Sequence, residues 1–144
     1  MYENYTRQAL PEKYYRELLG TALCVFNSNN AFIIKTILRL DISGKYDWYH
    51  LTDLESGKLR PSVQNVISTQ CGSDIEALFL NLVKRRNRII HSYRITNSSG
   101  QQVLATKTPI KDGNVQFEIT EEYLLEFIKL NEKLSSMLHN LRGY

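Results

Sequence analysis

The chain has 144 residues, of which 42% are hydrophobic and 23% are charged, and its formal net charge at pH 7 is +3. These values are ordinary for a soluble globular protein, so we expect one domain over residues 1–144 that is long enough to bury a core. No uninterrupted apolar run approaches the roughly 20 residues that span a bilayer, which excludes a membrane-spanning chain.

The two cysteines and the first residues of the chain indicate where in the cell the protein is located. Cys24 and Cys71 lie far apart in the sequence and have no metal-ligand residues nearby. A disulfide scaffold or a zinc site is therefore not expected. Residues 1–8 are polar and carry no signal-peptide pattern. We expect a cytoplasmic protein that has no membrane partner, cofactor or metal.

Helical periodicity dominates the first 40 residues. After Pro11, which suits an early helix position, apolar residues recur at helical spacing from Tyr15 to Phe26. Residues 27–30 are a cluster of serine and asparagine, which favours turns and caps, and another apolar run follows over 32–40. This pattern predicts two helices, either separate or continuous through a kink.

The middle of the chain changes from irregular to helical. Residues 41–60 show no clear periodicity and contain Gly44 and Gly57, so we expect a long loop and then a short helix over 61–69. Ser73 and Glu76 have the spacing of a capping box, which predicts a helix from Asp74 to about Ser92.

The last third combines strands with a final helix. Residues 94–119 alternate in polarity and include turn sequences at 97–100 and 112–114, which predicts a β-hairpin or a three-stranded meander. Thr120 is expected to cap a helix whose apolar stripe ends near Gly143. Together these elements predict a mainly α fold: an antiparallel four-helix bundle with a small β insertion before the last helix.

An arginine lies within the apolar stripe of the helix that begins at Asp74. At about 100° per residue, one face of that helix carries a continuous apolar stripe with Arg86 in its middle. The stripe consists of Ile75, Leu78, Phe79, Leu82, Val83, Ile89, Ile90 and Tyr93. Burying an unpaired cation is costly, so Arg86 should meet either a carboxylate from another helix or a cleft that holds an anionic ligand.

The surroundings of Arg86 in the sequence are strongly basic. No carboxylate occurs between Glu76 and Asp112, whereas this span contains Lys84, Arg85, Arg86, Arg88, Arg94, Lys107 and Lys111. Lys84, Arg85, Arg88 and Arg94 are therefore candidates for contacts with RNA phosphates, and a solvated helix face is the alternative interpretation.

The residues around Arg86 suit chemistry on a phosphodiester. His91 can move a proton to or from an attacking or leaving oxygen, while Arg86 donates hydrogen bonds to the non-bridging oxygens. Metal-dependent nucleases gather Asp and Glu side chains around divalent ions, and such ligands are missing near this motif. A metal-independent mechanism favours an internal nucleophile, which RNA supplies as its 2′-OH.

The spacing within the motif leaves one geometric question open. On an ideal helix Arg86 and His91 are about 140° apart, whereas Asn87 and His91 share a face. Arg86 and His91 converge either because the helix loosens near His91 or because a two-fold homodimer brings the motifs of two chains to one cleft. In either case Asn87 is expected to orient the imidazole.

Arg86, Asn87 and His91 resemble the signature of the HEPN superfamily, in which an arginine and a polar residue precede a histidine by a few positions. The resemblance implies a dimeric helical domain that acts as a metal-independent endoribonuclease in toxin–antitoxin or phage-defence systems, with Arg86, Asn87 and His91 as catalytic residues. His91-Ser92-Tyr93 also resembles the form found in toxins paired with small nucleotidyltransferase antitoxins. That likeness implies an antitoxin partner and possible modification of Tyr93 by AMP.

Two other hypotheses remain beside the ribonuclease. In the first, the same basic cleft belongs to a non-catalytic module that binds RNA, a nucleotide or a protein. In the second, the chain is a structural subunit in which Arg86 forms an internal salt bridge. A short distance from Arg86 to a buried carboxylate would support the structural subunit.

Overall fold

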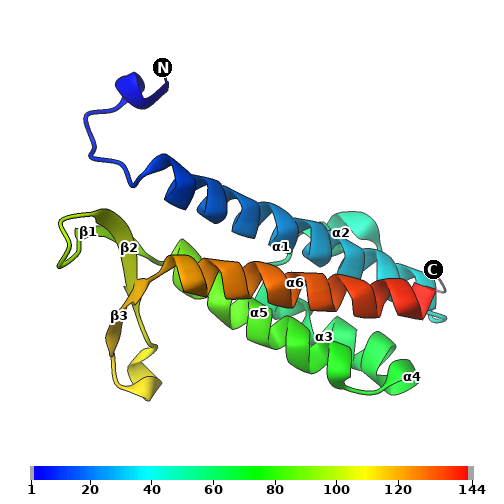
Figure 1. The fold of residues 1–144 in the computed structure, drawn as a ribbon. Coiled ribbons are helices and arrows are strands. Elements are labelled where there is room, and N and C mark those ends of the chain that lie inside the picture. Colours follow the sequence, from blue (N-terminus) through cyan, green and yellow to red (C-terminus); the bar gives the residue numbers. More distant parts are fainter. Residues whose placement is uncertain (1, 143–144) are drawn as a thin grey trace.

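The computed structural model describes residues 2–142, and these residues form a mainly helical molecule with a small antiparallel sheet. Its body consists of three long helices: α1 (Lys13–Leu40), α5 (Asp74–Ile90) and α6 (Glu121–Arg142) (Figure 1). Helix α6 packs against both α1 and α5. A short 3-10 turn, η1 (Tyr2–Tyr5), precedes α1.

Helix α1 runs without interruption through the asparagine-rich segment 27–30. The sequence predicts either two separate helices here or one continuous helix, and the continuous helix is the one that forms. The Asn29 amide is buried and donates hydrogen bonds to the main-chain and side-chain oxygens of Asn131 on α6, at 2.7 and 3.0 Å. Asn30 accepts a hydrogen bond of 2.8 Å from Ser56. Because these tertiary partners satisfy the amides, the side chains do not compete with the helix backbone for hydrogen bonds.

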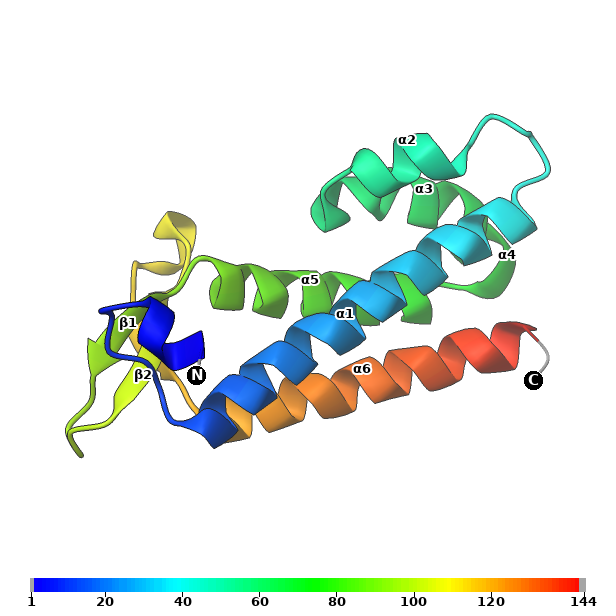
Figure 2. The same cartoon turned by 90° about the horizontal axis from the view of Figure 1, so that it is seen from above.

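The arrangement of the long helices differs from the expected antiparallel four-helix bundle, which is not confirmed. Helices α1 and α6 run in the same direction, while α5 runs the opposite way (Figures 1 and 2). The contacts agree, because Tyr15 lies by Ile119 just before α6, whereas Phe32 packs against His139 near the end of α6. The physical reason is that one continuous α1 replaces two predicted helices, which removes one reversal of chain direction.

Residues 48–71 form a series of short helical elements instead of one loop and one helix. They are α2 (Trp48–Asp53), the 3-10 turn η2 (Ser56–Leu59), α3 (Arg60–Ser62), the π-helical η3 (Val63–Ser68) and α4 (Thr69–Cys71). Segment η3 contacts both α1 and α5, and it buries Val63, Val66 and Ile67. This layer covers the two helices at the end distant from the sheet (Figure 2).

The predicted capping box at the start of α5 does not form, because the Ser73 side chain makes no cap hydrogen bond. Glu76 instead accepts hydrogen bonds from Ser68 at 2.8 Å and from Gln64 at 2.9 Å, and it lies 3.8 Å from Arg60 Nε. The Glu76 carboxylate therefore attaches α5 to the short-helix layer instead of closing its own first turn.

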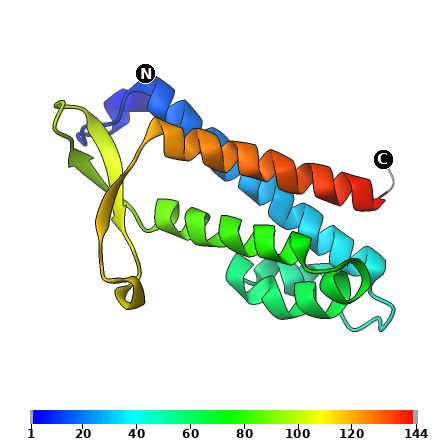
Figure 3. The same ribbon diagram turned by 60° about the horizontal axis from the view of Figure 1, so that its bottom comes forward.

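The β insertion is a three-stranded meander, one of the two forms that the sequence predicts. Strands β1 (Tyr93–Thr96), β2 (Gln102–Lys107) and β3 (Gln116–Ile119) pair antiparallel in the order β1-β2-β3. The sheet crosses the end of the helical body where α5 ends and α6 begins (Figure 3). The Tyr15 hydroxyl ties it to α1, because it donates to Ile119 O at 2.6 Å and accepts from Leu104 N–H at 3.1 Å.

The core lies where α1, α5 and α6 meet. Phe26 stacks on Phe79 with 6.4 Å between ring centroids and on Phe127 with 6.1 Å, and all three rings are almost completely buried. Thr120 caps α6 as expected, by accepting a hydrogen bond from Tyr123 N–H at 3.1 Å. Within residues 2–142, no helix combines the length and the apolar character that crossing a membrane requires.

Candidate active site around Arg86 and His91

Arg86 is half-buried on α5, on the side that faces the core aromatic rings. Its guanidinium carbon lies 5.7 Å above the ring centroid of Phe26 on α1, and Nη1 donates a long hydrogen bond of 3.4 Å to Asn87 Oδ1. Among the buried side-chain polar atoms that the structure describes, only Arg86 Nε lacks a hydrogen-bond partner. No described carboxylate forms a salt bridge with Arg86.

Of the two environments expected for Arg86, the pairing with a carboxylate does not occur among the described residues. A structural salt bridge would place a carboxylate within about 4 Å of the guanidinium. The contact with Phe26 is a cation–π interaction, which accepts the charge without using the N–H donors. The guanidinium N–H groups other than Nη1 make no hydrogen bond with a described residue, and Nε is buried without a partner.

His91 ends α5 and has an exposed side chain. Its backbone leaves the helical conformation, with φ −94° and ψ 44°, although its N–H still donates to Asn87 O at 2.9 Å. The imidazole makes no hydrogen bond with any described residue, so it is open to solvent. The expected hydrogen bond from the Asn87 side chain to the ring is absent from residues 2–142, and Asn87 Oδ1 accepts from Arg86.

Strand β2 holds the end of α5 in place. The Thr106 hydroxyl donates to His91 O at 3.2 Å, and Arg88 Nη1 donates to Lys107 O at 2.7 Å. Both acceptors are main-chain carbonyls, and the His91 carbonyl is among those that the end of a helix leaves without a partner inside the helix. The β insertion thus positions the motif, because one strand contacts both Arg88 and His91.

The apolar stripe of α5 becomes exposed at the motif. Ile75, Phe79, Leu82, Val83 and Ile89 are buried, whereas Ile90 is 46% exposed and Tyr93, the first residue of β1, is 42% exposed. Large apolar side chains at this exposure leave an uncovered apolar surface beside Arg86 and His91.

Of the four residues predicted to contact RNA phosphates, some already have partners within the chain and others do not. Arg85 Nε donates to Asn81 at 2.9 Å, and Arg85 Nη2 lies 3.6 Å from Glu126 on α6. Arg94 donates to the Gln102 side chain on the paired strand. Lys84 is exposed and makes no such contact among the described residues. Lys84 and Arg88 line one hollow in the surface.

That hollow lies between α5 and the 3-10 turn η4 (Ile110–Asp112), which belongs to the β2–β3 connection. We call it the basic hollow, and its volume is about 290 Å³. Its lining consists of Lys84, Asn87, Arg88, Pro109, Lys111 and Asp112. Since Asn87 belongs to the motif, the hollow adjoins the residues to which the resemblance assigns catalysis.

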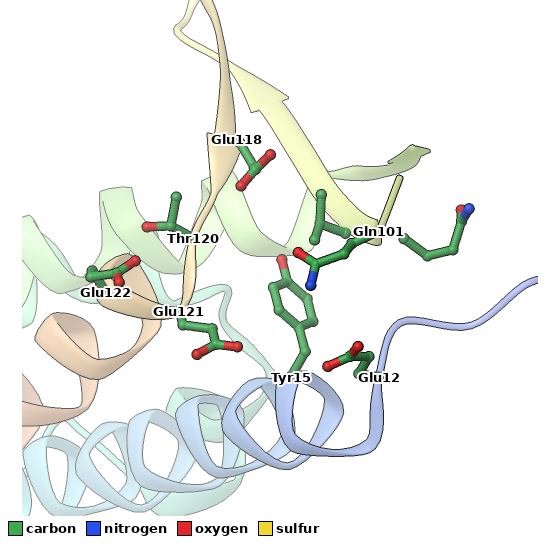
Figure 4. Close-up of a pocket in the computed structure, with 9 residues that line it drawn as sticks. Glu12, Tyr15, Gln101, Glu118, Thr120, Glu121 and Glu122 are labelled. Atoms are coloured by element: carbon green, nitrogen blue, oxygen red, sulfur yellow. The ribbon is translucent and has the colours of Figure 1, made fainter. Parts of the chain in front are cut away.

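A second hollow has the opposite charge. It lies where α1 and α6 begin, it has a volume of about 180 Å³, and Glu12, Glu118, Glu121 and Glu122 line it together with Tyr15 (Figure 4). Burial raises the pKa of the Tyr15 phenol, against the hydrogen bond from Leu104, while Glu118 and Glu121 raise it further. Four carboxylates repel phosphate, so this hollow does not suit RNA.

Several residues of the site carry no signal in the sequence. Phe26, which faces Arg86, and Glu126, which pairs with Arg85, come from other helices. Tyr123 on α6 lies under Arg85, with 5.8 Å from the guanidinium carbon to the ring centroid. Burial raises the pKa of Tyr123, and the cations of Arg85 and Arg88 oppose this. Lys111 belongs to the basic span, but its sequence position does not indicate that it faces α5.

Within residues 2–142, no three His, Cys, Asp or Glu side chains are grouped so that they could hold a metal ion. Comparisons with protein-family models, with curated proteins and with solved structures give no match for this chain. The functional interpretation therefore depends on the motif and on its surroundings in the structure.

Proposed function

We propose that this protein is a metal-independent endoribonuclease of the HEPN type. The observation that carries the proposal is Arg86, a cation set in an apolar helix face without a carboxylate partner among the described residues. A buried N–H without a partner is costly, and such a group persists where function requires it. The exposed His91, about one and a half turns further along, supplies an imidazole that can act in proton transfer.

The proposed reaction is attack by the RNA 2′-oxygen on the adjacent phosphorus. The P–O5′ bond breaks, and the products carry a 2′,3′-cyclic phosphate and a 5′-hydroxyl. His91 acts as general base toward the 2′-OH or as general acid toward the leaving 5′-oxygen. Arg86 stabilises the charge on the non-bridging oxygens of the phosphorane, and Asn87 positions the Arg86 guanidinium.

We further propose that the site is completed by a homodimer. Arg86 and His91 share no hydrogen bond in one chain, and the imidazole is free to meet groups of a second chain. The exposed Ile90 supplies an apolar surface that a partner copy could cover. A two-fold axis beside α5 would then bring two motifs to one cleft.

The proposed setting is a toxin–antitoxin or phage-defence system. Tyr93 lies two residues after His91, and its 42% exposure makes the phenol accessible to a modifying enzyme. We propose that an AMP group on Tyr93, added by a nucleotidyltransferase-type antitoxin, would block the cleft and silence the nuclease.

The proposal is tested by the cleavage of a labelled RNA with wild-type protein and three variants. His91→Ala should slow cleavage by about 10²- to 10⁴-fold and Arg86→Ala by about 10²-fold or more, with the fold retained. Lys45→Ala is the matched control, because this exposed lysine follows α1 at the end of the molecule distant from the sheet (Figure 1). Equal cleavage by all four proteins would rule the proposal out.

A second candidate function is a non-catalytic module that binds RNA, a nucleotide or a protein. The basic hollow favours it, because Lys84, Arg88 and Lys111 can hold a phosphate whether or not His91 moves a proton. Retention of RNA without cleavage, in both the wild type and His91→Ala, would identify this function.

A further inference from the structure

We infer that the basic hollow binds one phosphate of the RNA backbone next to the bond that is cut, and that the turn η4 acts as a clamp through Lys111. This inference deepens the proposed function, because it assigns RNA to the site and gives a role to the β insertion. The contacts that carry it come from two elements that are distant in the sequence, α5 and the β2–β3 connection.

The α5 side of the hollow presents two cations on one face. Lys84 and Arg88 are four residues apart, so they are neighbours about 6 Å apart along the helix axis. Arg88 Nη1 donates to Lys107 O at 2.7 Å, which restrains the position of the guanidinium. An arginine has five N–H donors, and no other described residue accepts from this one, so the remaining donors are available to a phosphate.

The opposite side is the turn η4, which has a defined backbone. Asp112 N–H donates to Pro109 O at 2.9 Å and Gly113 N–H donates to Ile110 O at 3.1 Å. Gly113 has φ +95°, a left-handed conformation that glycine adopts without strain. Lys111 lies in this turn and lines the hollow together with Lys84 and Arg88.

The charge of the hollow suits a phosphodiester. Three cations, Lys84, Arg88 and Lys111, outnumber the one carboxylate of Asp112, so the hollow keeps a positive charge after it takes up a group of charge −1. Arg85 and Arg94 lie outside the lining and already have partners, Glu126 and Gln102. We therefore assign phosphate binding to Lys84, Arg88 and Lys111, and we do not assign it to Arg85 or Arg94.

The hollow is also placed next to the proposed chemistry. Asn87 lines it, and Asn87 Oδ1 accepts the hydrogen bond from Arg86 Nη1 at 3.4 Å. A phosphate held by Lys84, Arg88 and Lys111 would therefore lie beside Asn87, the residue that contacts Arg86. Its binding would position the neighbouring nucleotide for attack.

The test measures the affinity of a fluorescent single-stranded RNA for His91→Ala protein, which leaves the RNA uncut. Adding Lys111→Ala should weaken binding by about three- to tenfold at low salt and lower the slope of log affinity against log salt by about 0.7, the value for one phosphate contact on a single strand. Adding Lys45→Ala, the matched control, should change neither quantity. Lys111 is exposed, so its replacement should not disturb folding.

The outcomes distinguish a failure of the phosphate-binding inference from a failure of the proposed nuclease activity. If Lys111→Ala and Lys45→Ala behave alike, the basic hollow does not bind the RNA backbone, even when the wild type cleaves RNA. If the slope falls but the wild type does not cleave, the hollow stands as an RNA site and the proposed nuclease activity is wrong.

Discussion

Replacing Arg86 by methionine should leave the stability of the fold close to that of the wild type, while RNA cleavage is lost. Methionine has a similar length and no polar donor, so it can cover Phe26 without the buried Nε that lacks a partner. Residues retained for function often reduce stability in this way.

The magnitude follows from the contacts of the guanidinium. Removing an unsatisfied buried N–H should gain about 1–3 kcal/mol of unfolding free energy. Losing the cation–π contact with Phe26 costs about 0.5–2 kcal/mol, and losing the long hydrogen bond to Asn87 costs about 0.5 kcal/mol. The net change should lie between a loss of about 1.5 kcal/mol and a gain of about 2 kcal/mol, which shifts Tm by no more than roughly 7 °C in either direction for a chain of this size.

Chemical denaturation and thermal melting of the purified proteins provide the assay, with Arg85→Met as the matched control. That variant breaks the partly exposed ion pair with Glu126, so it should lose about 0–1 kcal/mol and keep its RNA cleavage. A loss of more than about 2 kcal/mol in Arg86→Met would refute the reasoning, because the guanidinium would then be a structural element of the core.

Three further outcomes are expected. His91→Ala should change the unfolding free energy by less than about 0.5 kcal/mol, because the side chain is exposed and makes no described hydrogen bond; urea titration beside the cleavage assay checks this. Tyr15→Phe should destabilise the protein by about 1–3 kcal/mol, because the hydroxyl hydrogen-bonds to both Ile119 O and Leu104 N–H. If the two proteins are equally stable, these hydrogen bonds do not attach the sheet to α1. Burial raises the pKa of Tyr15 above its ordinary value of 10.0, so the folded state holds the phenolic proton more tightly than the unfolded state. The unfolding free energy should therefore stay level with respect to this group below pH 10.0 and fall as the pH rises above it, and the fall should be shallower in Tyr15→Phe.

Local patterns in the sequence predict the elements around the motif, because their causes are local. The alternation over 94–119 and its glycine-containing turns indicate the meander that forms, and Thr120 caps the last helix as expected. The apolar stripe of α5 is correct as far as Ile89 and fails at Ile90, which stays exposed. Side-chain spacing along a helix depends on the backbone alone, so it can be derived without a tertiary structure.

The features that the sequence does not predict depend on contacts between distant segments. Asn29 has a high preference for turns, yet its buried hydrogen bonds to Asn131 keep α1 continuous. Glu76 has capping-box spacing, but Ser68 and Gln64 are closer partners. The same limit applies to the site, because Lys111 and Arg88 line one hollow only when the meander has folded beside α5.

The most direct test of the ribonuclease is the chemistry of its products. An RNA oligonucleotide is incubated with the wild-type protein in the presence of a chelator, beside the same oligonucleotide with one 2′-deoxy nucleotide at the cut position. We predict fragments with 2′,3′-cyclic phosphate and 5′-hydroxyl ends by mass spectrometry, and no cut at the 2′-deoxy position. Cleavage of the 2′-deoxy substrate at that position, or no cleavage of either RNA, would contradict the proposed roles of Arg86 and His91.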